Sequence, residues 1–213
     1  MTVVEERAVA AEPGAETARR AMVDSQLRVS GINDAPILAA FLSVPRENFV
    51  PEARRAVAYA DRAVALGEGE ALGEGEALGA GGVLSPALTY GQMLTAAQLG
   101  PDDTVLVIGQ PGGYLAALAE QLCANVTLCA ATGDWAASGA HSLVLIDGAI
   151  ADVPAALAGV VATDGRLVTG VIERGVTRLA LGRKVGDALA LTVLAEADFA
   201  PLAAFAAHPQ WSF

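Results

Sequence analysis

The stretch Thr104-Val-Leu-Val-Ile-Gly-Gln-Pro-Gly-Gly-Tyr114 decides the fold predicted for this chain. Its first five residues are β-branched or leucine, which is typical of a parallel strand covered on both faces. The turn that follows contains three glycines, Gly109, Gly112 and Gly113, which let the backbone approach a ligand closely. A helix is predicted over residues 114–123. The order of strand, glycine turn and helix indicates a nucleotide-binding α/β sheet, although such turns also occur in α/β proteins that bind nothing there.

Further strands are predicted after this unit. They cover residues 125–130, 142–146 and 166–172, and Gly186-Asp187 is predicted to turn between two antiparallel strands within residues 176–194. Asp147 follows the second of these strands directly, at the carboxyl end where open α/β sheets place ligands. A helix is expected from Asp152 to about Val161.

Helices are predicted before the central strand. One covers residues 17–29 and ends at Gly31, and Asn33 or Asp34 caps the next. The segment Val44-Pro-Arg-Glu-Asn-Phe-Val-Pro51 follows, and its two prolines favour an extended or turn conformation. A further helix is expected over residues 88–99 after Ser85-Pro86, with Ser85 suited to cap it.

Two segments lack a regular pattern. Residues 1–16 mix Ala, Glu, Gly and Pro, which predicts a disordered lead-in, and residues 17–213 are predicted to form one domain. Residues 65–84 contain Ala-Leu-Gly-Glu-Gly-Glu twice, and this Gly/Glu-rich repeat predicts a low-complexity loop. The repeat is either an accident of sequence duplication or an active-site lid.

Composition excludes several classes of function. The net charge of −11 repels a phosphate backbone, so nucleic acid is not expected as a partner. No apolar run is long enough to span a bilayer, and the first residues lack the order of a signal peptide, so a cytoplasmic protein is expected. The two cysteines and two histidines have no spacing typical of metal ligands, so no metal site is predicted.

Several segments together resemble the protein-L-isoaspartate O-methyltransferase family. The match runs from about Ala21 onward, and its most diagnostic part is the proline-bracketed segment at residues 44–51. The other matching segments are Met22-Val-Asp-Ser-Gln-Leu27, Tyr59-Ala-Asp-Arg62, Ser85-Pro86, Ile146-Asp-Gly-Ala149, Val153-Pro154 and Asp164-Gly-Arg-Leu167.

The resemblance implies a doubly wound, Rossmann-like sheet of seven strands that binds S-adenosylmethionine across the carboxyl ends of its first strands. It implies methyl transfer to the carboxylate of isoaspartyl residues in damaged proteins, a repair reaction. Because that carboxylate is already ionised at neutral pH, the enzyme mainly has to align it and exclude water. Ser85 stands where the family has a hydroxyl that holds the substrate carboxylate.

The chain departs from the family in its cofactor motif. Val107 stands where the family has an acid, and Pro111 replaces the middle glycine, while Gly109 and Gly113 remain. One lost charge-assisted hydrogen bond weakens cofactor binding by about ten- to a hundredfold. Residues 131–141, between two predicted strands, are also too few for a full crossover helix and strand.

This short segment contains two further candidates for cofactor contact. Gly133-Asp134 resembles a Gly-Asp pair that contacts the adenine region in the family, and Trp135 follows it; alternatively, Asp134 only caps a helix. The strand at residues 125–130 then corresponds either to the second or to the third strand of the family.

Two hypotheses therefore remain open. In the first, the chain is a divergent methyltransferase that binds S-adenosylmethionine through Gly109, Gly113, Asp134, Trp135 and Asp147 and orients its substrate with Ser85. In the second, it keeps the fold but acts as a non-catalytic binding or structural protein. A lost helix would also uncover apolar surface on the sheet, which predicts a homodimer.

Overall fold

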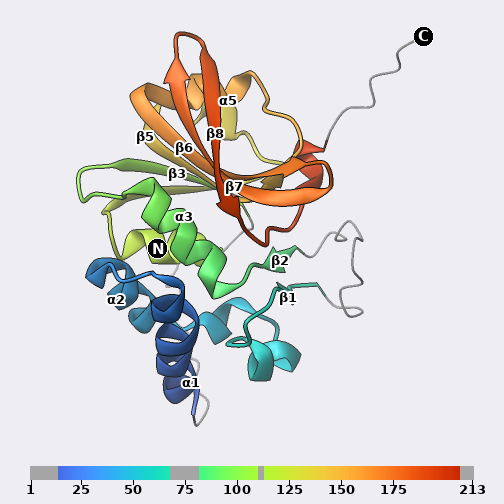
Figure 1. Cartoon of the computed structure of the whole chain (residues 1–213). Helices are drawn as coiled ribbons and strands as arrows, with labels where there is room; N and C mark the ends of the chain where they lie inside the picture. The colour runs from blue at the N-terminus through green and yellow to red at the C-terminus, as the bar shows by residue number, and fades with distance from the viewer. Residues whose placement is uncertain (1–13, 68–81, 110–112, 207–213) are drawn as a thin grey trace, which may run out of the picture.

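A computed structural model shows a mixed sheet with helices on both faces (Figure 1), and it describes residues 14–67, 82–109 and 113–206. Most of the Gly/Glu-rich repeat, residues 68–81, therefore lies outside the described residues. So do residues 1–13 of the predicted lead-in and Pro111 and Gly112 of the glycine turn.

The main sheet has six strands in the order β4-β3-β5-β6-β7-β8. The first four are parallel, and β7 and β8 add an antiparallel hairpin, as the sequence predicts. Gly186, at the hairpin turn, has a φ of 61°, which suits glycine. The strands are β3 (Thr104–Gly109), β4 (Asn125–Ala130), β5 (His141–Ile150), β6 (Val161–Glu173), β7 (Val176–Val185) and β8 (Ala188–Glu196).

Alternating side chains of the parallel strands point into two separate cores. Val105 and Val107 of β3 face one core together with the N-terminal helices, α3 and α4. Leu106 and Ile108 face the other core, which α5 and Phe205 help to cover. The helices are α1 (Ala15–Met22), α2 (Ala35–Ser43), α3 (Ala87–Ala97), α4 (Tyr114–Glu120) and α5 (Ala156–Val160).

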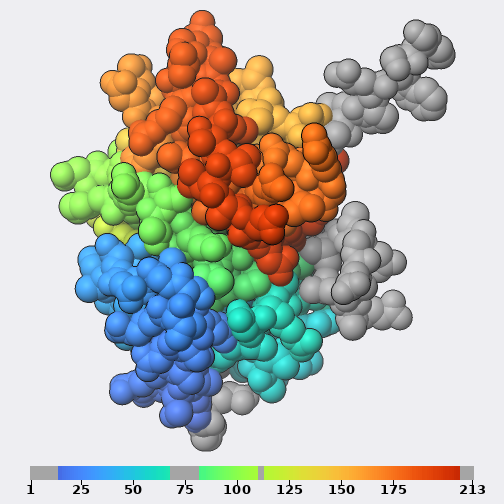
Figure 2. Space-filling view, viewed as in Figure 1, coloured from blue at the N-terminus to red at the C-terminus, as the bar shows by residue number. Residues whose placement is uncertain are grey.

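The N-terminal helices gather at one end of the molecule, while the β7–β8 hairpin lies toward the other end (Figure 2). Helix α1 continues through a π-helical turn, Val23–Leu27, and a 3-10 turn, Arg28–Ser30, which ends at Gly31 with φ 87°. Asp34 caps α2, because its side chain accepts a hydrogen bond from the Ile37 N–H at 3.0 Å. None of the helices in the described residues is long and apolar enough to cross a membrane.

Two predicted boundaries need correction. Helix α1 begins at Ala15, inside the predicted lead-in 1–16, and an ion pair between Glu16 and Arg20 one turn apart supports its start. The ends of the predicted loop 65–84 are ordered as strands, because β1 (Val64–Ala65) pairs with β2 (Val83–Leu84). The two ends of the repeat segment are therefore held side by side.

The described sheet lacks the seventh strand that the family resemblance implies. Strand β4 pairs directly with β3 and forms the sheet edge, so it takes the place of the second strand. Only residues 131–140 connect β4 to β5, and their only helical turn is Trp135–Ala137. An extended chain advances about 3.3 Å per residue, whereas a helix advances about 1.5 Å. The few residues of this connection can therefore reach the start of β5 only if most of them are extended.

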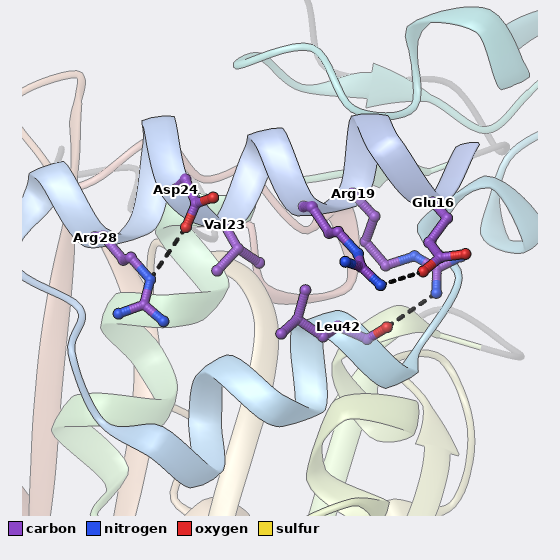
Figure 3. Close-up of a pocket in the computed structure, with 7 residues that line it drawn as sticks. Glu16, Arg19, Val23, Asp24, Arg28 and Leu42 are labelled. Atoms are coloured by element: carbon purple, nitrogen blue, oxygen red, sulfur yellow. Dashed lines mark hydrogen bonds and ion pairs between the residues drawn. The ribbon is translucent and has the colours of Figure 1, made fainter. Parts of the chain in front are cut away.

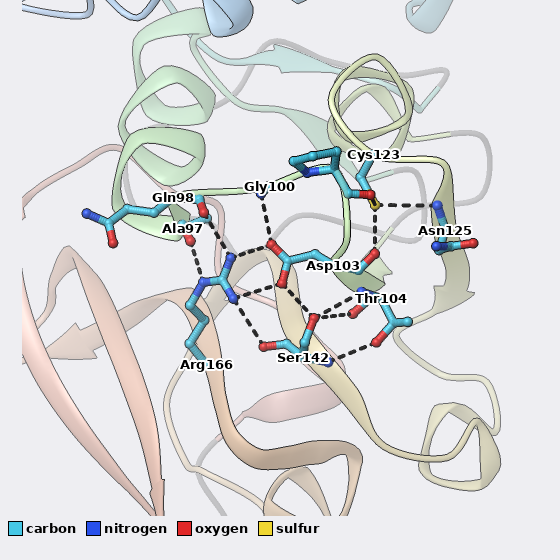
Figure 4. A network of polar contacts seen from close by, with 10 residues as sticks. Ala97, Gln98, Gly100, Asp103, Thr104, Cys123, Asn125, Ser142 and Arg166 are labelled. Carbon is cyan, nitrogen blue, oxygen red and sulfur yellow. Dashed lines mark hydrogen bonds and ion pairs between the residues drawn. The ribbon is translucent and has the colours of Figure 1, made fainter.

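A polar network fastens the amino ends of the parallel strands (Figure 4). The Arg166 guanidinium donates to both carboxylate oxygens of Asp103 at 3.0 and 2.7 Å, and Ser142 donates to Asp103 at 2.6 Å. Arg166 also donates to the backbone carbonyls of Ala97 and Gln98, where α3 ends. One partly buried ion pair thus joins β3, β5 and β6 to the end of α3.

We expect Asp103→Asn to lower the free energy of unfolding at pH 7 by about 1 to 2 kcal/mol, because it removes a charge-assisted pair. The Arg166 hydrogen bonds hold the pKa of Asp103 at about 2, below the ordinary 3.8. The stabilisation is therefore present above about pH 4 and is lost as the pH falls toward 2. Urea unfolding between pH 2 and 7 measures this, with exposed Asp102→Asn as the control; equal acid sensitivity in wild type and Asp103→Asn would contradict it.

Candidate functional site

Gly109 and Asp147 meet at the carboxyl ends of β3 and β5. A Cβ atom added to Gly109 would lie 2.8 Å from the Asp147 Cβ, so only glycine fits here. Asp147 is 8% exposed and lies within β5, which continues to Ile150, rather than after the strand as the sequence predicts. Gly109, at the start of the glycine turn, and this carboxylate therefore lie at one site.

Helix α3 brings Tyr90 and Ser85 to the same place. The Tyr90 hydroxyl accepts a hydrogen bond from the Ser85 N–H at 3.1 Å and donates to the Asp147 carboxylate at 3.4 Å. Ser85 is 2% exposed, and its side chain does not cap α3, whose N-cap is Pro86. The capping interpretation of Ser85 is therefore wrong, and the residue lies beside the site.

Arg46 and Tyr114 lie behind these groups and are fully buried. The Arg46 guanidinium carbon lies 5.1 Å from the centre of the Tyr114 ring and 5.9 Å from that of Tyr90. Arg46 Nη1 and the Tyr114 hydroxyl have no hydrogen-bond partner among the described residues. Arg46, Tyr90 and Tyr114 are not among the site residues predicted from the sequence, although an arginine between two prolines is a signal for such a role.

Burial controls the charge of Asp147. It raises the pKa of the carboxyl to about 7, while the Tyr90 hydrogen bond and the Arg46 charge act in the opposite direction. Burial likewise raises the pKa of Tyr90 well above its ordinary value, so this hydroxyl keeps its proton at neutral pH. Asp147 is therefore a carboxylate whose charge changes near neutral pH and which forms no ion pair within the described residues.

Three further site residues are predicted from the sequence, namely Gly113, Asp134 and Trp135. Gly113 is the residue before α4, at the far end of the glycine turn. Asp134 is exposed and occupies the N-cap position of the 3-10 turn Trp135–Ala137, as the capping alternative predicts, but its side chain accepts no capping hydrogen bond. Trp135 lies in the other core, with its ring centre 5.8 Å from that of Phe205. The structure thus brings together Ser85, Gly109 and Asp147, and it places Trp135 on the other face of the sheet.

A cleft lies beside Ser85. Its cavity volume is about 500 Å³, and Pro86 and α3 form one wall while the start of β7 and the end of β8 form another. The Thr89 hydroxyl donates to the Asp198 carbonyl at 3.1 Å and holds the walls together. Pro86 lines the cleft, whereas its neighbour Ser85 is buried next to it and does not line it.

A second hollow lies along α1 and does not form part of this site (Figure 3). Its charged residues pair with one another, Arg20 with Glu16 at 2.5 Å and Arg28 with Asp24 at 3.2 Å. In the described part of the chain, no group of three or more His, Cys, Asp or Glu side chains is placed to hold a metal ion.

Comparisons with known proteins agree on one family. The model of the protein-L-isoaspartate(D-aspartate) O-methyltransferase family matches residues 17–131. The protein-L-isoaspartate O-methyltransferase of Roseiflexus castenholzii is 32% identical over 211 residues, which cover 86% of this chain and 91% of the relative. That of Methylorubrum extorquens is 29% identical over 217 residues, covering 89% and 90%.

Solved structures show the same fold. A protein-L-isoaspartate O-methyltransferase structure matches with a TM-score of 0.65 and 16% identity, over 88% of this chain and 65% of that one. A beta-aspartate methyltransferase from Plasmodium falciparum, in complex with S-adenosyl-L-homocysteine, matches with a TM-score of 0.63 and 15% identity, over 90% of this chain and 99% of that one. The family model matches more than half of this chain, and the chain covers most of the length of a relative that is 32% identical to it. The chain therefore belongs to the protein-L-isoaspartate O-methyltransferase family.

Proposed function

We propose that the chain transfers a methyl group from S-adenosylmethionine to the carboxylate of isoaspartyl residues in proteins or peptides, as a repair enzyme. The observation that carries this proposal is the buried Asp147 carboxylate against Gly109, next to Ser85, in a member of this family. Two free cysteines are in keeping with a reducing, cytoplasmic location.

The residues present fit the cofactor. S-adenosylmethionine, when bound, supplies an activated methyl group next to a positive charge. A buried carboxylate without an ion pair, such as that of Asp147, suits a cationic ligand. We assign Gly109 and Gly113 to the close approach of the backbone, Asp147 to the cationic part, and Asp134 to the adenine side.

Ser85 is proposed to hold the acceptor carboxylate. The cleft lined by Pro86, the residue after Ser85, is the proposed docking place of the peptide. No general base is needed because the acceptor is ionised at neutral pH. The protein then contributes alignment and exclusion of water rather than acid–base chemistry.

The alternative function is that of a non-catalytic binding or structural protein. The observation that favours it is Val107, a fully buried apolar side chain at the position where the family has an acid. Cofactor binding separates the two functions.

We expect micromolar binding of S-adenosylhomocysteine by calorimetry, up to about tenfold tighter at pH 8 than at pH 6. The reason is that Asp147, with its pKa near 7, is charged at pH 8 and largely protonated at pH 6, while S-adenosylhomocysteine, which lacks the sulfonium, keeps its cationic ammonium group at both pH values. Asp147→Asn should weaken binding at pH 8 and abolish this pH dependence, and Asp134→Ala should weaken it at both pH values. No heat at millimolar ligand from folded protein would establish the alternative function, and Asp102→Asn serves as the exposed control.

We expect Ser85→Ala to raise the KM for an isoaspartyl peptide by about tenfold, because one hydrogen bond to a charged acceptor is lost. Ser85→Thr should recover most of the loss, and S-adenosylhomocysteine binding should not change. A methylation assay with isoaspartyl and aspartyl peptides of the same sequence measures both effects. The control is Ser138→Ala, because the Ser138 hydroxyl donates to the Trp135 carbonyl at the other face of the sheet. An unchanged KM in Ser85→Ala would show that Ser85 does not hold the acceptor.

We also propose a homodimer, formed through the open edge of the sheet. Strand β4 has no further pairing partner among the described residues, carries no charged side chain and leaves Leu128 36% exposed. Such an unprotected edge suits pairing with the same strand of a second copy. Light scattering across micromolar concentrations should show a dimer in the wild type and a monomer in Leu128→Lys, whereas a wild-type monomer throughout would contradict it.

A further inference from the structure

Arg46 is an unusual residue for the interior of this protein. Its guanidinium keeps its charge in proteins, yet the residue is 0% exposed and is one of the largest fully buried side chains among the described residues. It lies in the 3-10 turn Arg46–Phe49, within the proline-bracketed segment 44–51. That segment helps to identify the family, but the proposed function gives it no role.

The hydrogen bonds of Arg46 join two distant parts of the chain. Its Nε donates to the Ala58 carbonyl at 2.6 Å, and its Nη2 donates to the Ser85 carbonyl at 2.5 Å. In the sequence, Ala58 precedes the Gly/Glu-rich repeat segment and Ser85 follows it. One guanidinium therefore fixes the backbone of the residue that we assign to the acceptor.

Arg46 also acts on Asp147. The groups that face this carboxylate are the Tyr90 hydroxyl from α3, the uncharged Gly109 from β3 and the positive charge of Arg46. Arg46 is the only cation among them, and its Nη1 has no hydrogen-bond partner in the described part of the chain. In a buried environment such a charge acts on its neighbours more strongly than it would in water.

We propose that Arg46 is a positioning residue that serves both halves of the site: it fixes Ser85 through its backbone carbonyl and places a positive charge behind Asp147. The inference rests on the proposed function, in which Ser85 holds the acceptor and Asp147 faces the cofactor. In this role Arg46 acts through Ser85 and Asp147 rather than on either ligand directly.

The test compares Arg46→Lys, which keeps the charge but loses the planar fork, with Arg46→Gln, which loses the charge. Carbon NMR of labelled Asp side chains, with Asp147→Asn to assign the signal, follows the Asp147 titration without any ligand. We expect a midpoint near the wild-type value in Arg46→Lys and an upward shift of about one pH unit in Arg46→Gln. At pH 7, Arg46→Gln should bind S-adenosylhomocysteine about five- to tenfold more weakly and recover at pH 9.

The Ser85 half of the inference has its own readout. Both Arg46 variants should raise the acceptor KM by about tenfold, since both disturb the Ser85 carbonyl contact. Arg166→Gln is the matched control: Arg166 also donates to two backbone carbonyls, but at the opposite end of the sheet. It should lower the melting temperature without moving the Asp147 midpoint or the acceptor KM.

The outcomes are distinguishable. If the Arg46 variants lose stability like Arg166→Gln while the Asp147 midpoint and the KM stay at wild-type values, Arg46 is only a structural residue and the inference is wrong. If Arg46→Gln does not fold, Arg46→Lys still decides, because an unchanged KM in that variant also overturns the Ser85 half. If the Asp147 midpoint shifts as expected but no protein binds S-adenosylhomocysteine, the proposed function fails and the Arg46–Asp147 coupling stands.

Discussion

The burial of the Arg46 guanidinium is the constraint on which the site depends. A charge removed from water without compensation costs many kcal/mol, and arginine cannot avoid this cost by losing its proton. The surrounding chain compensates with two backbone carbonyls, the faces of two tyrosine rings and the nearby Asp147. Each of these groups must stay in place for Arg46 to stay buried. The compensation of one charge therefore holds together a 3-10 turn, the start of α3, the start of α4 and the end of β5.

Local sequence patterns predict much of the fold because they concern contacts between near neighbours. The runs of β-branched residues predict β3 and β4, Asp34 predicts the cap of α2, and Gly186 predicts the hairpin turn, all of which the structure confirms. The starts and ends of the elements are less well predicted. Strand β5 continues past the predicted end at Ile146, because pairing with β6 and a parallel bridge between Ala149 and Pro201 extend it.

The site depends on contacts that no local pattern contains. Tyr90 and Asp147 are separated by 57 positions in the sequence, and Arg46 and Ser85 by 39. The sequence indicates that Ser85, Gly109 and Asp147 belong near a ligand, but not that Asp147 is buried or that Ser85 is fixed through its carbonyl. For Trp135 the sequence suggests a ligand contact, whereas the structure shows a packing contact. Its neighbour Asp134 suggests contact with the cofactor, but the indole of Trp135 packs beside Phe205 and covers the sheet next to the short crossover.

The missing acid of β3 and the buried acid of β5 are best understood together. Val107 pairs in register with Leu145, and alternate residues of a strand share a face, so Asp147 lies one pleat farther toward the carboxyl end on the face that Val107 occupies. A charge at residue 107 would lie within the apolar core formed by Val105, Leu143 and Leu145. At residue 147 the carboxylate has the Tyr90 hydroxyl as a hydrogen-bond donor, Gly109 without a side chain beside it, and the positive charge of Arg46. The neighbouring strand β5 therefore carries a carboxylate, Asp147, at a position where the interior can accommodate one. It can do so because the positive charge of Arg46 lies behind Asp147.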